Sequence, residues 1–167
     1  MGRVLLCLAL AATTAVVFWP VVGHDFVHLD DETYVTKNPH VRGGLTGAGL
    51  HWAWTTGYAA NWHPLTWMSY MLDWQLFGER AAGHHLVSLA LHALSTALLF
   101  LVLERATGRR GRSACVALLF GVHPLHVESV GWVAERKDVL STLFWFLALY
   151  AYVRDAAAPR LRTWILT

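Results

Sequence analysis

The chain has 167 residues, of which 56% are hydrophobic and 14% are charged, and its formal net charge is +2. Soluble domains carry charge on about a quarter of their residues, so this composition is typical of a membrane protein. The net charge is small and no basic run is interleaved with aromatic residues, which argues against a nucleic-acid partner. Cys7 and Cys115 both lie inside apolar runs, so we expect no disulfide framework.

The first predicted element is a membrane span over residues 3–22. The apolar run from Val4 to Val22 is about as long as a helix needs to be to cross a bilayer. A signal peptide would have a shorter apolar core and a small-residue cleavage site, and Val21-Val22-Gly23 is a poor match to such a site. The pattern therefore favours an uncleaved span.

A long loop, residues 23–84, follows this span. Its five tryptophans argue against disorder, because disordered segments are poor in aromatic residues. Within residues 62–78, apolar side chains recur at helical spacing and predict a helix that lies along the membrane surface. Near its start the loop has three consecutive acids, Asp30, Asp31 and Glu32. They could have a catalytic role, or they could lie in a solvated loop or cap a helix.

Three further spans are predicted, over residues 85–104, 113–131 and 139–153, and residues 164–167 resemble the opening of a fifth. The span over residues 113–131 is interrupted by the polar stretch from His123 to Glu128. The fold class is therefore an all-α, multi-pass membrane protein, and the chain is expected to be part of a larger helical bundle.

Arginines predict the orientation of these spans. They fall in alternate segments: Arg3, Arg105, Arg109, Arg110, Arg112, Arg154, Arg160 and Arg162. Basic residues concentrate on the cytoplasmic side, so the N-terminus is predicted to be cytoplasmic. The loop over residues 23–84 and the hairpin over residues 123–138 then face outward.

Ionisable residues interrupt the apolar runs around the hairpin. Charged groups at membrane depth are costly and usually face a cavity or one another, which favours a cavity here, with a solvated hairpin tip as the alternative. His123-Pro-Leu-His126 lacks the H-E-x-x-H pattern of a zinc protease, so no metal site is predicted. A requirement for a divalent metal stays open.

Four segments resemble one known family. They are "FVHLDD" after the first span, "WHPLTWMSYMLDWQLFG", "HLVSLALH", and the most specific, "LFGVHPLHVESVGWVAERKDVLS". Together they resemble the N-terminal part of the transmembrane-and-TPR-repeat proteins, GT-C type glycosyltransferases that include O-mannosyltransferases. His63 and Ser88 stand where that family has Arg and Asn.

The resemblance implies a reaction and its site. A mannose-like sugar would pass from a polyprenyl or dolichyl phosphate to a protein or glycan hydroxyl on the non-cytoplasmic side. Asp30 would act as general base, with Asp31 orienting it or sharing its role. Arg136 would contact the donor phosphate, with Lys137 second. Six further residues are expected to line the cavity: His85, His92, His123, His126, Glu128 and Asp138.

Two other function classes stay open. A non-catalytic membrane scaffold, or an inactive fragment of the enzyme, would keep the fold without transfer. A transporter is the third class, because polar residues within spans also mark substrate paths; no inverted repeat supports it. The expected location is an integral membrane position, in the inner membrane of a bacterium or the endoplasmic reticulum of a eukaryote.

Overall fold

The computed structural model describes residues 2–156, and within that range every regular element is a helix. Three segments are long and apolar enough to cross a membrane: Arg3–Gly23, Ala81–Thr107 and Val133–Ala156. They include the predicted spans 3–22, 85–104 and 139–153. The predicted all-α, multi-pass membrane fold is thus confirmed. Arg160, Arg162 and the suggested fifth span lie outside the described residues.

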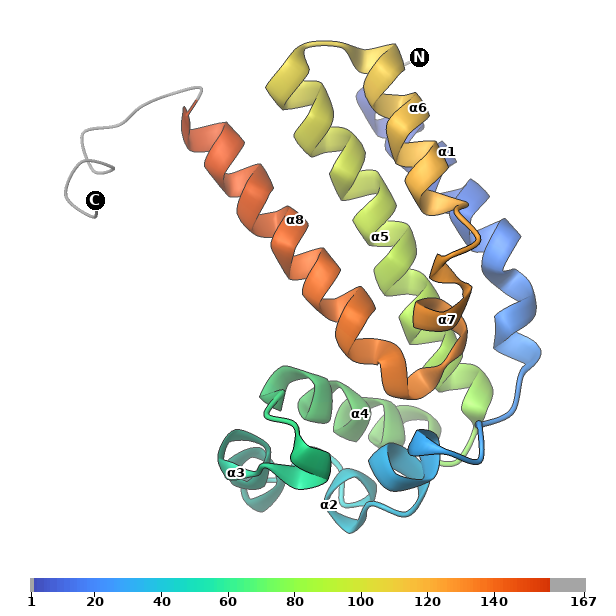
Figure 1. Ribbon diagram of the computed structural model, residues 1–167, viewed down its shortest axis with the longest axis vertical. Coiled ribbons are helices and arrows are strands. Elements are labelled where there is room, and N and C mark those ends of the chain that lie inside the picture. The colour runs from blue at the N-terminus through green and yellow to red at the C-terminus, as the bar shows by residue number, and fades with distance from the viewer. Residues whose placement is uncertain (1, 157–167) are drawn as a thin grey trace, which may run out of the picture.

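The spans form an elongated bundle, with the loop region packed across one end of it (Figure 1). Its long helices are α1 (Arg3–Phe18), α5 (Ala81–Thr107), α6 (Arg110–Gly121) and α8 (Arg136–Ala156). A 3-10 turn, η1 (Trp19–Gly23), continues α1, and another, η4 (Val133–Glu135), precedes α8. The N-terminus, the α5–α6 turn and the end of α8 all lie at the opposite end from the loop region. The segments rich in arginine therefore share one end of the bundle.

The predicted span over residues 113–131 is two helices rather than one. The 12 residues of α6 are about 18 Å long, shorter than the roughly 30 Å hydrocarbon core of a bilayer. The chain then leaves the helical path before Pro124, as expected for residues that precede a proline, and resumes as α7 (His126–Gly131). Irregular backbone at membrane depth is tolerated where it lines a cavity or is buried in protein.

Close packing holds α1, α5 and α6 together. A side chain at Gly121 would overlap Thr14 of α1 and Thr96 of α5, so only glycine allows this approach. The buried carbonyl of Gly121 accepts a hydrogen bond from His92 Nε2, at 3.0 Å, which satisfies a backbone group freed by the end of α6. At the arginine-rich end, Glu104 accepts from Arg3 Nε and Arg110 Nε, each at 2.6 Å.

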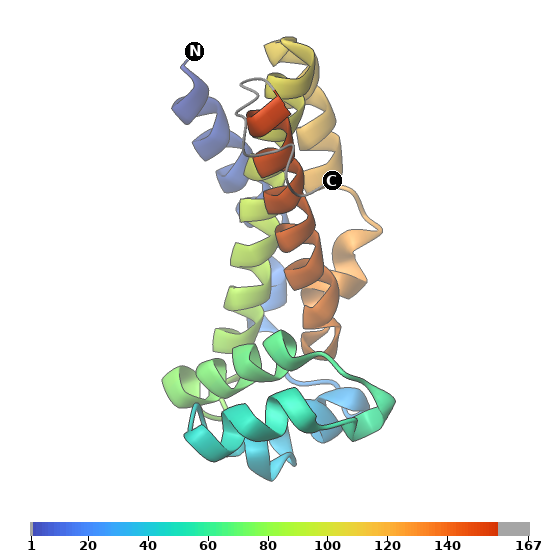
Figure 2. The same ribbon diagram turned by 90° about the vertical axis from the view of Figure 1, so that its left-hand side faces the viewer.

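The loop region has a hydrophobic core of its own. Its elements are η2, a π-helical turn (Glu32–Thr36), α2 (Pro39–Arg42), α3 (Gly47–Thr55), a 3-10 turn η3 (Tyr58–Ala60) and α4 (Pro64–Phe77). Trp67, Tyr70 and Met71 of α4 are fully buried in this core, and Val133 and Ala134 of η4 join it. As the periodicity predicts, α4 is a helix, and it lies across the ends of the spanning helices (Figure 2). Its opposite face leaves Leu65, Leu72 and Leu76 exposed.

Candidate functional site

An apolar groove lies between the loop region and α8. Its volume is about 760 Å³, which is large enough for a segment of a hydrocarbon chain. One wall is the stretch from Trp62 to Thr66 together with Trp54, and the other is one face of α8, on which side chains three or four residues apart align. The α8 wall consists of Lys137, Asp138, Leu140, Ser141, Phe144, Trp145 and Ala148.

Ionisable side chains gather where α8 begins, at the end of this groove that adjoins the loop region. We call Asp30, Tyr34, His63 and Lys137 the groove mouth: His63 and Lys137 line the groove, whereas Tyr34 packs on His63 without lining it and the charge of Asp30 acts on Tyr34. Burial raises the pKa of the Tyr34 hydroxyl, the charge of Lys137 lowers it and the charge of Asp30 raises it. Both charges therefore lie within electrostatic reach of this hydroxyl, which also accepts a hydrogen bond from Asn61 Nδ2 at 2.8 Å.

His63 lines the groove and stands where the family that this chain resembles has an arginine. Its ring lies 5.8 Å from that of Tyr34 and 4.6 Å from that of Trp67. Burial lowers the pKa of the His63 imidazole, and the positive charge of Lys137 lowers it further. His63 is therefore neutral at pH 7, and Lys137 is the cation of the groove mouth.

Asp31 is buried, in contrast to the exposed Asp30 beside it. Its Oδ1 accepts a hydrogen bond from the Ala134 amide at 2.7 Å, and its Oδ2 accepts one from the Val27 amide at 2.9 Å. Burial raises the pKa of Asp31, whereas the two amide donors lower it. Since both oxygens are occupied, Asp31 does not fit the predicted sharing of the base role; it joins the loop to η4 and fixes the backbone beside Asp30.

Arg136 is the centre of a buried ion-pair network. It is fully buried, and its guanidinium lies 2.7 Å from Asp73 Oδ2. Its three nitrogens also donate hydrogen bonds to Ser88 Oγ, Ser69 Oγ and the His84 carbonyl, at 2.6 to 2.8 Å. Every donor nitrogen thus has a protein acceptor. The prediction that Arg136 contacts the donor phosphate does not fit this structure, and Lys137, the second choice, is the remaining candidate.

Tyr70 reinforces the same junction. Its hydroxyl lies 2.8 Å from the Val133 carbonyl, to which it donates, and 3.1 Å from that of Ala134, and its ring lies 5.6 Å from the Arg136 guanidinium carbon. Burial raises the pKa of Tyr70 well above its ordinary value, so the phenol stays neutral. We call Asp31, Tyr70, Asp73 and Arg136 the buried junction, because they attach the loop region to the start of α8.

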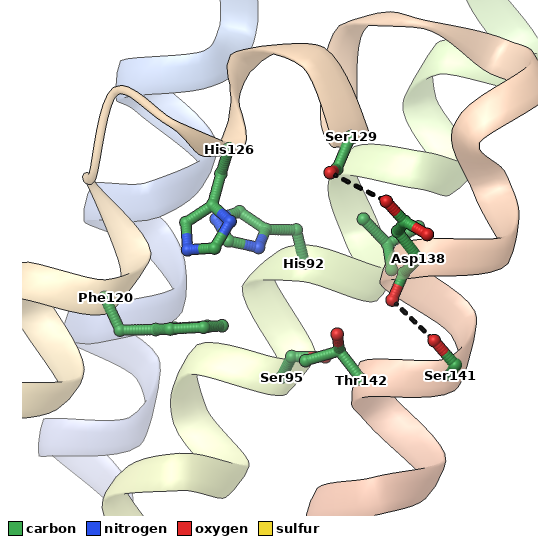
Figure 3. A pocket seen from close by; sticks show the side chains of 9 residues that line it. His92, Ser95, Phe120, His126, Ser129, Asp138, Ser141 and Thr142 are labelled. Carbon is green, nitrogen blue, oxygen red and sulfur yellow. Dashed lines mark hydrogen bonds between the residues drawn. The ribbon is translucent and has the colours of Figure 1, made fainter.

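A second, polar cavity of about 260 Å³ lies on the other side of the start of α8. Figure 3 shows His92 of α5 and His126 of α7 close to each other, with Phe120 beside them; the two imidazole centres are 4.9 Å apart. Asp138 accepts a hydrogen bond from Ser129 Oγ at 3.3 Å. Asp138 and Ser141 line both the cavity and the apolar groove, so the first turns of α8 separate the two.

The remaining predicted cavity residues lie elsewhere. Of the six, His92, His126 and Asp138 line the polar cavity. His85 is fully buried and lines neither the cavity nor the groove, whereas His123 and Glu128 are exposed on the hairpin. Among residues 2–156, no cluster of three His, Cys, Asp or Glu side chains could hold a metal ion.

Sequence reasoning missed Asp73, Ser69 and Tyr34. A signal existed for Asp73, since it is the one acid in the aromatic helical stretch from Pro64 to Phe77, and a buried acid needs a partner. Ser88 was noted only as a departure from the family pattern, yet it accepts from Arg136. No local pattern distinguishes Tyr34 or Ser69, because their roles come from contacts with residues distant in sequence.

Comparison with known proteins gives a consistent result. A family model described as dolichyl-phosphate-mannose-protein mannosyltransferase matches residues 64–167. Protein O-mannosyl-transferase TMTC1 of Homo sapiens is 35% identical over 143 residues, which are 78% of this chain and 16% of the relative.

Two further relatives agree. Protein O-mannosyl-transferase Tmtc1 of Drosophila melanogaster is 32% identical over 151 residues, or 86% of this chain and 18% of the relative. Protein O-mannosyl-transferase TMTC2 of Mus musculus is 30% identical over 122 residues, or 72% and 14%. The chain thus spans less than a fifth of the length of these curated relatives. No solved structure matches it.

Proposed function

Because the chain belongs to the dolichyl-phosphate-mannose-protein mannosyltransferase family, we propose that it forms the donor-binding part of a membrane glycosyltransferase. The donor would be a lipid-phosphate-linked, mannose-like sugar, and the acceptor a hydroxyl group of a protein or glycan. The observation that supports this most is the apolar groove with the cation Lys137 in its lining, together with the exposed Asp30, whose charge acts on Tyr34 beside His63 of the groove. A lipid phosphate needs an apolar groove and a cation, since its chain is apolar and its headgroup anionic, and the acceptor hydroxyl needs the acid.

The groove would take the first part of the lipid chain. Aromatic and aliphatic side chains form most of its surface, and several of them are otherwise exposed: Trp145 at 64%, Trp62 at 65% and Phe144 at 48%. Covering such surface with a hydrocarbon chain stabilises the complex by about 25 cal/mol per Å². The phosphate would then lie at the groove mouth, within reach of Lys137.

Lys137 would offset the charge that develops on the leaving phosphate. Its Nζ now lies 2.7 Å from Glu135, and the two side chains are 36% and 19% exposed. Partly exposed ion pairs of this kind contribute only about 0–1 kcal/mol, so a phosphate can replace Glu135 at little cost. A compact ammonium group suits a point contact of this type.

Asp30 would act as the general base. The acceptor oxygen attacks the anomeric carbon as its proton passes to Asp30, the carbon–oxygen bond to the phosphate breaks, and the lipid phosphate leaves. Direct displacement of this kind inverts the anomeric centre. Asp30 is exposed, so an acceptor hydroxyl can approach it, and the fixed backbone at Asp31 holds its position.

Sugar transfer by membranes that carry the full-length protein tests this proposal. Asp30→Asn preserves shape and removes the proton acceptor, so turnover should fall by about 10²–10⁴-fold while donor binding stays near wild type. Asp25→Asn, the same change at another exposed acid of the loop, is the matched control and should transfer normally. Transfer by Asp30→Asn within about twofold of wild type would exclude Asp30 as base, whereas absence of transfer by the wild-type protein would favour the scaffold function.

The same proposal includes a topology. The arginine-rich ends of the helices would face the cytoplasm, and the groove mouth would face the lumen of the endoplasmic reticulum or the periplasm. In a background without Cys7 and Cys115, a membrane-impermeant thiol reagent applied to intact cells should label Thr36→Cys and not Arg110→Cys if the protein lies in the plasma membrane. In intact vesicles whose cytoplasmic face is outside, it should label Arg110→Cys and not Thr36→Cys.

A further inference from the structure

A basic pocket lies at the end of the bundle opposite the groove mouth. The proposed sugar transfer gives no role to the residues at this end. It has a volume of about 200 Å³ and is formed by the α5–α6 turn and the adjoining turns of both helices. Ser88, which accepts from Arg136 of the buried junction, and the pocket residues Leu103 and Thr107 all belong to α5, so the pocket is about 20–30 Å from the junction along the helix. A ligand there cannot be the reacting sugar phosphate.

Positive charge dominates this end of the bundle. Arg3 and Arg110 share Glu104 as their acceptor, which neutralises the carboxylate. Arg109 and Arg112 make no ion pair with any acid among residues 2–156, and both line the pocket. Two guanidinium groups without a carboxylate beside them attract an anion, and their planar donors suit phosphate oxygens.

The chemistry of the pocket changes with depth. Arg109 and Arg112 lie at the end of the helices, Thr107 and Ser113 come next, and the apolar Leu103 and Val116 lie about one turn further into the span. Residues three or four apart share a helix face, so the pairs Leu103–Thr107 and Arg112–Val116 each form a column. The order from guanidinium to hydroxyl to hydrocarbon is the order of phosphate, ester and acyl chain in a phospholipid.

The turn that forms the pocket is well ordered by its own hydrogen bonds. Gly108 ends α5 in a left-handed conformation, at φ 66°, as is common at helix C-termini. Thr107 Oγ1 donates to the Leu103 carbonyl at 2.7 Å and accepts from the Arg109 amide at 3.2 Å, and Ser113 Oγ donates to the Arg109 carbonyl at 2.9 Å. The backbone under the two arginines is therefore in place before a ligand arrives.

We propose that this pocket binds the headgroup of an anionic phospholipid, as a structural lipid that is distinct from the sugar donor. The phosphate contacts Arg109 and Arg112, and the first part of an acyl chain covers Leu103 and Val116. Basic pockets between membrane helices recognise anionic headgroups in this way. The bound lipid bridges the end of α5 and the start of α6.

The test measures lipid binding to the full-length protein in neutral detergent. Dioleoylphosphatidylglycerol and dioleoylphosphatidylcholine are titrated separately, and bound lipid is counted by native mass spectrometry. We expect the anionic lipid to bind at least tenfold more tightly, and Arg109→Gln/Arg112→Gln to lose about tenfold or more of that affinity, as for hydrogen bonds to a charged group. Arg42→Gln/Arg80→Gln removes the same charge at the other end and should bind as wild type does.

Other results would overturn the proposal. Unchanged selectivity in the Arg109/Arg112 variant would show that these arginines do not bind the headgroup, and an equal loss in the Arg42/Arg80 variant would show only general charge attraction. Inorganic phosphate in excess should not displace the lipid; displacement would mean that the apolar wall contributes nothing. Modification of the wild-type protein with phenylglyoxal avoids mutation altogether. Phosphatidylglycerol should protect Arg109 and Arg112 and leave Arg42 and Arg80 reactive.

Discussion

The buried junction and the groove mouth contain the same kinds of side chain but place them in opposite environments. Arg136 and Lys137 are adjacent in sequence, yet Arg136 is fully buried against Asp73 while Lys137 is 36% exposed beside Glu135. Asp31 and Asp30 differ in the same way: the first is fully buried and bonded to two backbone amides, and the second is exposed.

This difference separates structural from reactive charge. A charge that has lost its water and gained fixed partners cannot exchange them for a substrate without a large penalty. A charge at a wet rim can do so at little cost. The junction therefore fixes the position of the start of α8, and the groove mouth has the groups that remain available to a ligand.

The largest effect is expected for Arg136→Ala. The change leaves Asp73 buried without its cation, and breaking a buried pair in this way typically costs about 3–5 kcal/mol of folding free energy. Denaturant unfolding in detergent, followed by tryptophan fluorescence, measures it. Lys137→Ala, one residue along α8, is the matched control and should change stability by under about 0.5 kcal/mol.

A double variant sharpens this prediction. Asp73→Leu/Arg136→Met replaces the ion pair by apolar groups and should recover much of the lost stability, because both desolvation penalties disappear. A loss below about 1 kcal/mol in Arg136→Ala would contradict the description of the junction as a structural element and would restore Arg136 as a candidate phosphate ligand.

The next effect concerns donor affinity. Lys137→Gln removes the cation of the groove mouth, and the loss of a hydrogen bond to a charged group costs about 1.5–3 kcal/mol, or about tenfold or more in the dissociation constant of the lipid-phosphate sugar. Thermal stability should stay unchanged. Lys37→Gln, which removes an exposed lysine paired with Glu32, is the control; equal affinity of both variants would remove Lys137 from the site.

The smallest effect is a shift in the titration of His63. The charge of Lys137 is one of the two causes that lower the pKa of this imidazole, so Lys137→Gln should raise that pKa. Proton NMR of selectively labelled histidine measures it. Arg42→Gln, a charge removal elsewhere in the loop region, should leave it in place, and an unmoved His63 in the Lys137 variant would show that the two groups are not neighbours.

The sign of the accompanying pH dependence follows from the lowered pKa of His63. The unfolded chain takes up a proton on this imidazole near the ordinary pKa of 6.5, before the folded protein does. The contribution of His63 to stability is therefore fully present above that pH and decreases as the pH falls below it. His63→Gln should remove this part of the pH dependence.

The candidate site was predictable from the sequence only in part. That the segments with Asp30, Lys137 and Asp138 lie at the end of the bundle opposite the arginines follows from apolar run lengths and from arginine placement, which depend on residues close together in the chain. Which of two adjacent acids is buried, and which of two adjacent cations is paired, depends on Ala134, Ser69, Asp73 and Ser88, which lie 48 to 103 residues away from their partners. Spacing along the chain carries no record of such contacts.

The sequence by itself determined the helical class, the three long spans and the helix α4, because lipid and backbone hydrogen bonding leave few alternatives for apolar runs of that length. The polar stretch from His123 to Glu128 likewise marked the break in the remaining segment. Only the tertiary structure decided that Arg136 is a structural group, that the groove lies between Trp62 and α8, and that a polar cavity lies behind it. Those features arise where α4, α5 and α8 meet, and the physical reason is burial, which is set by packing among distant residues.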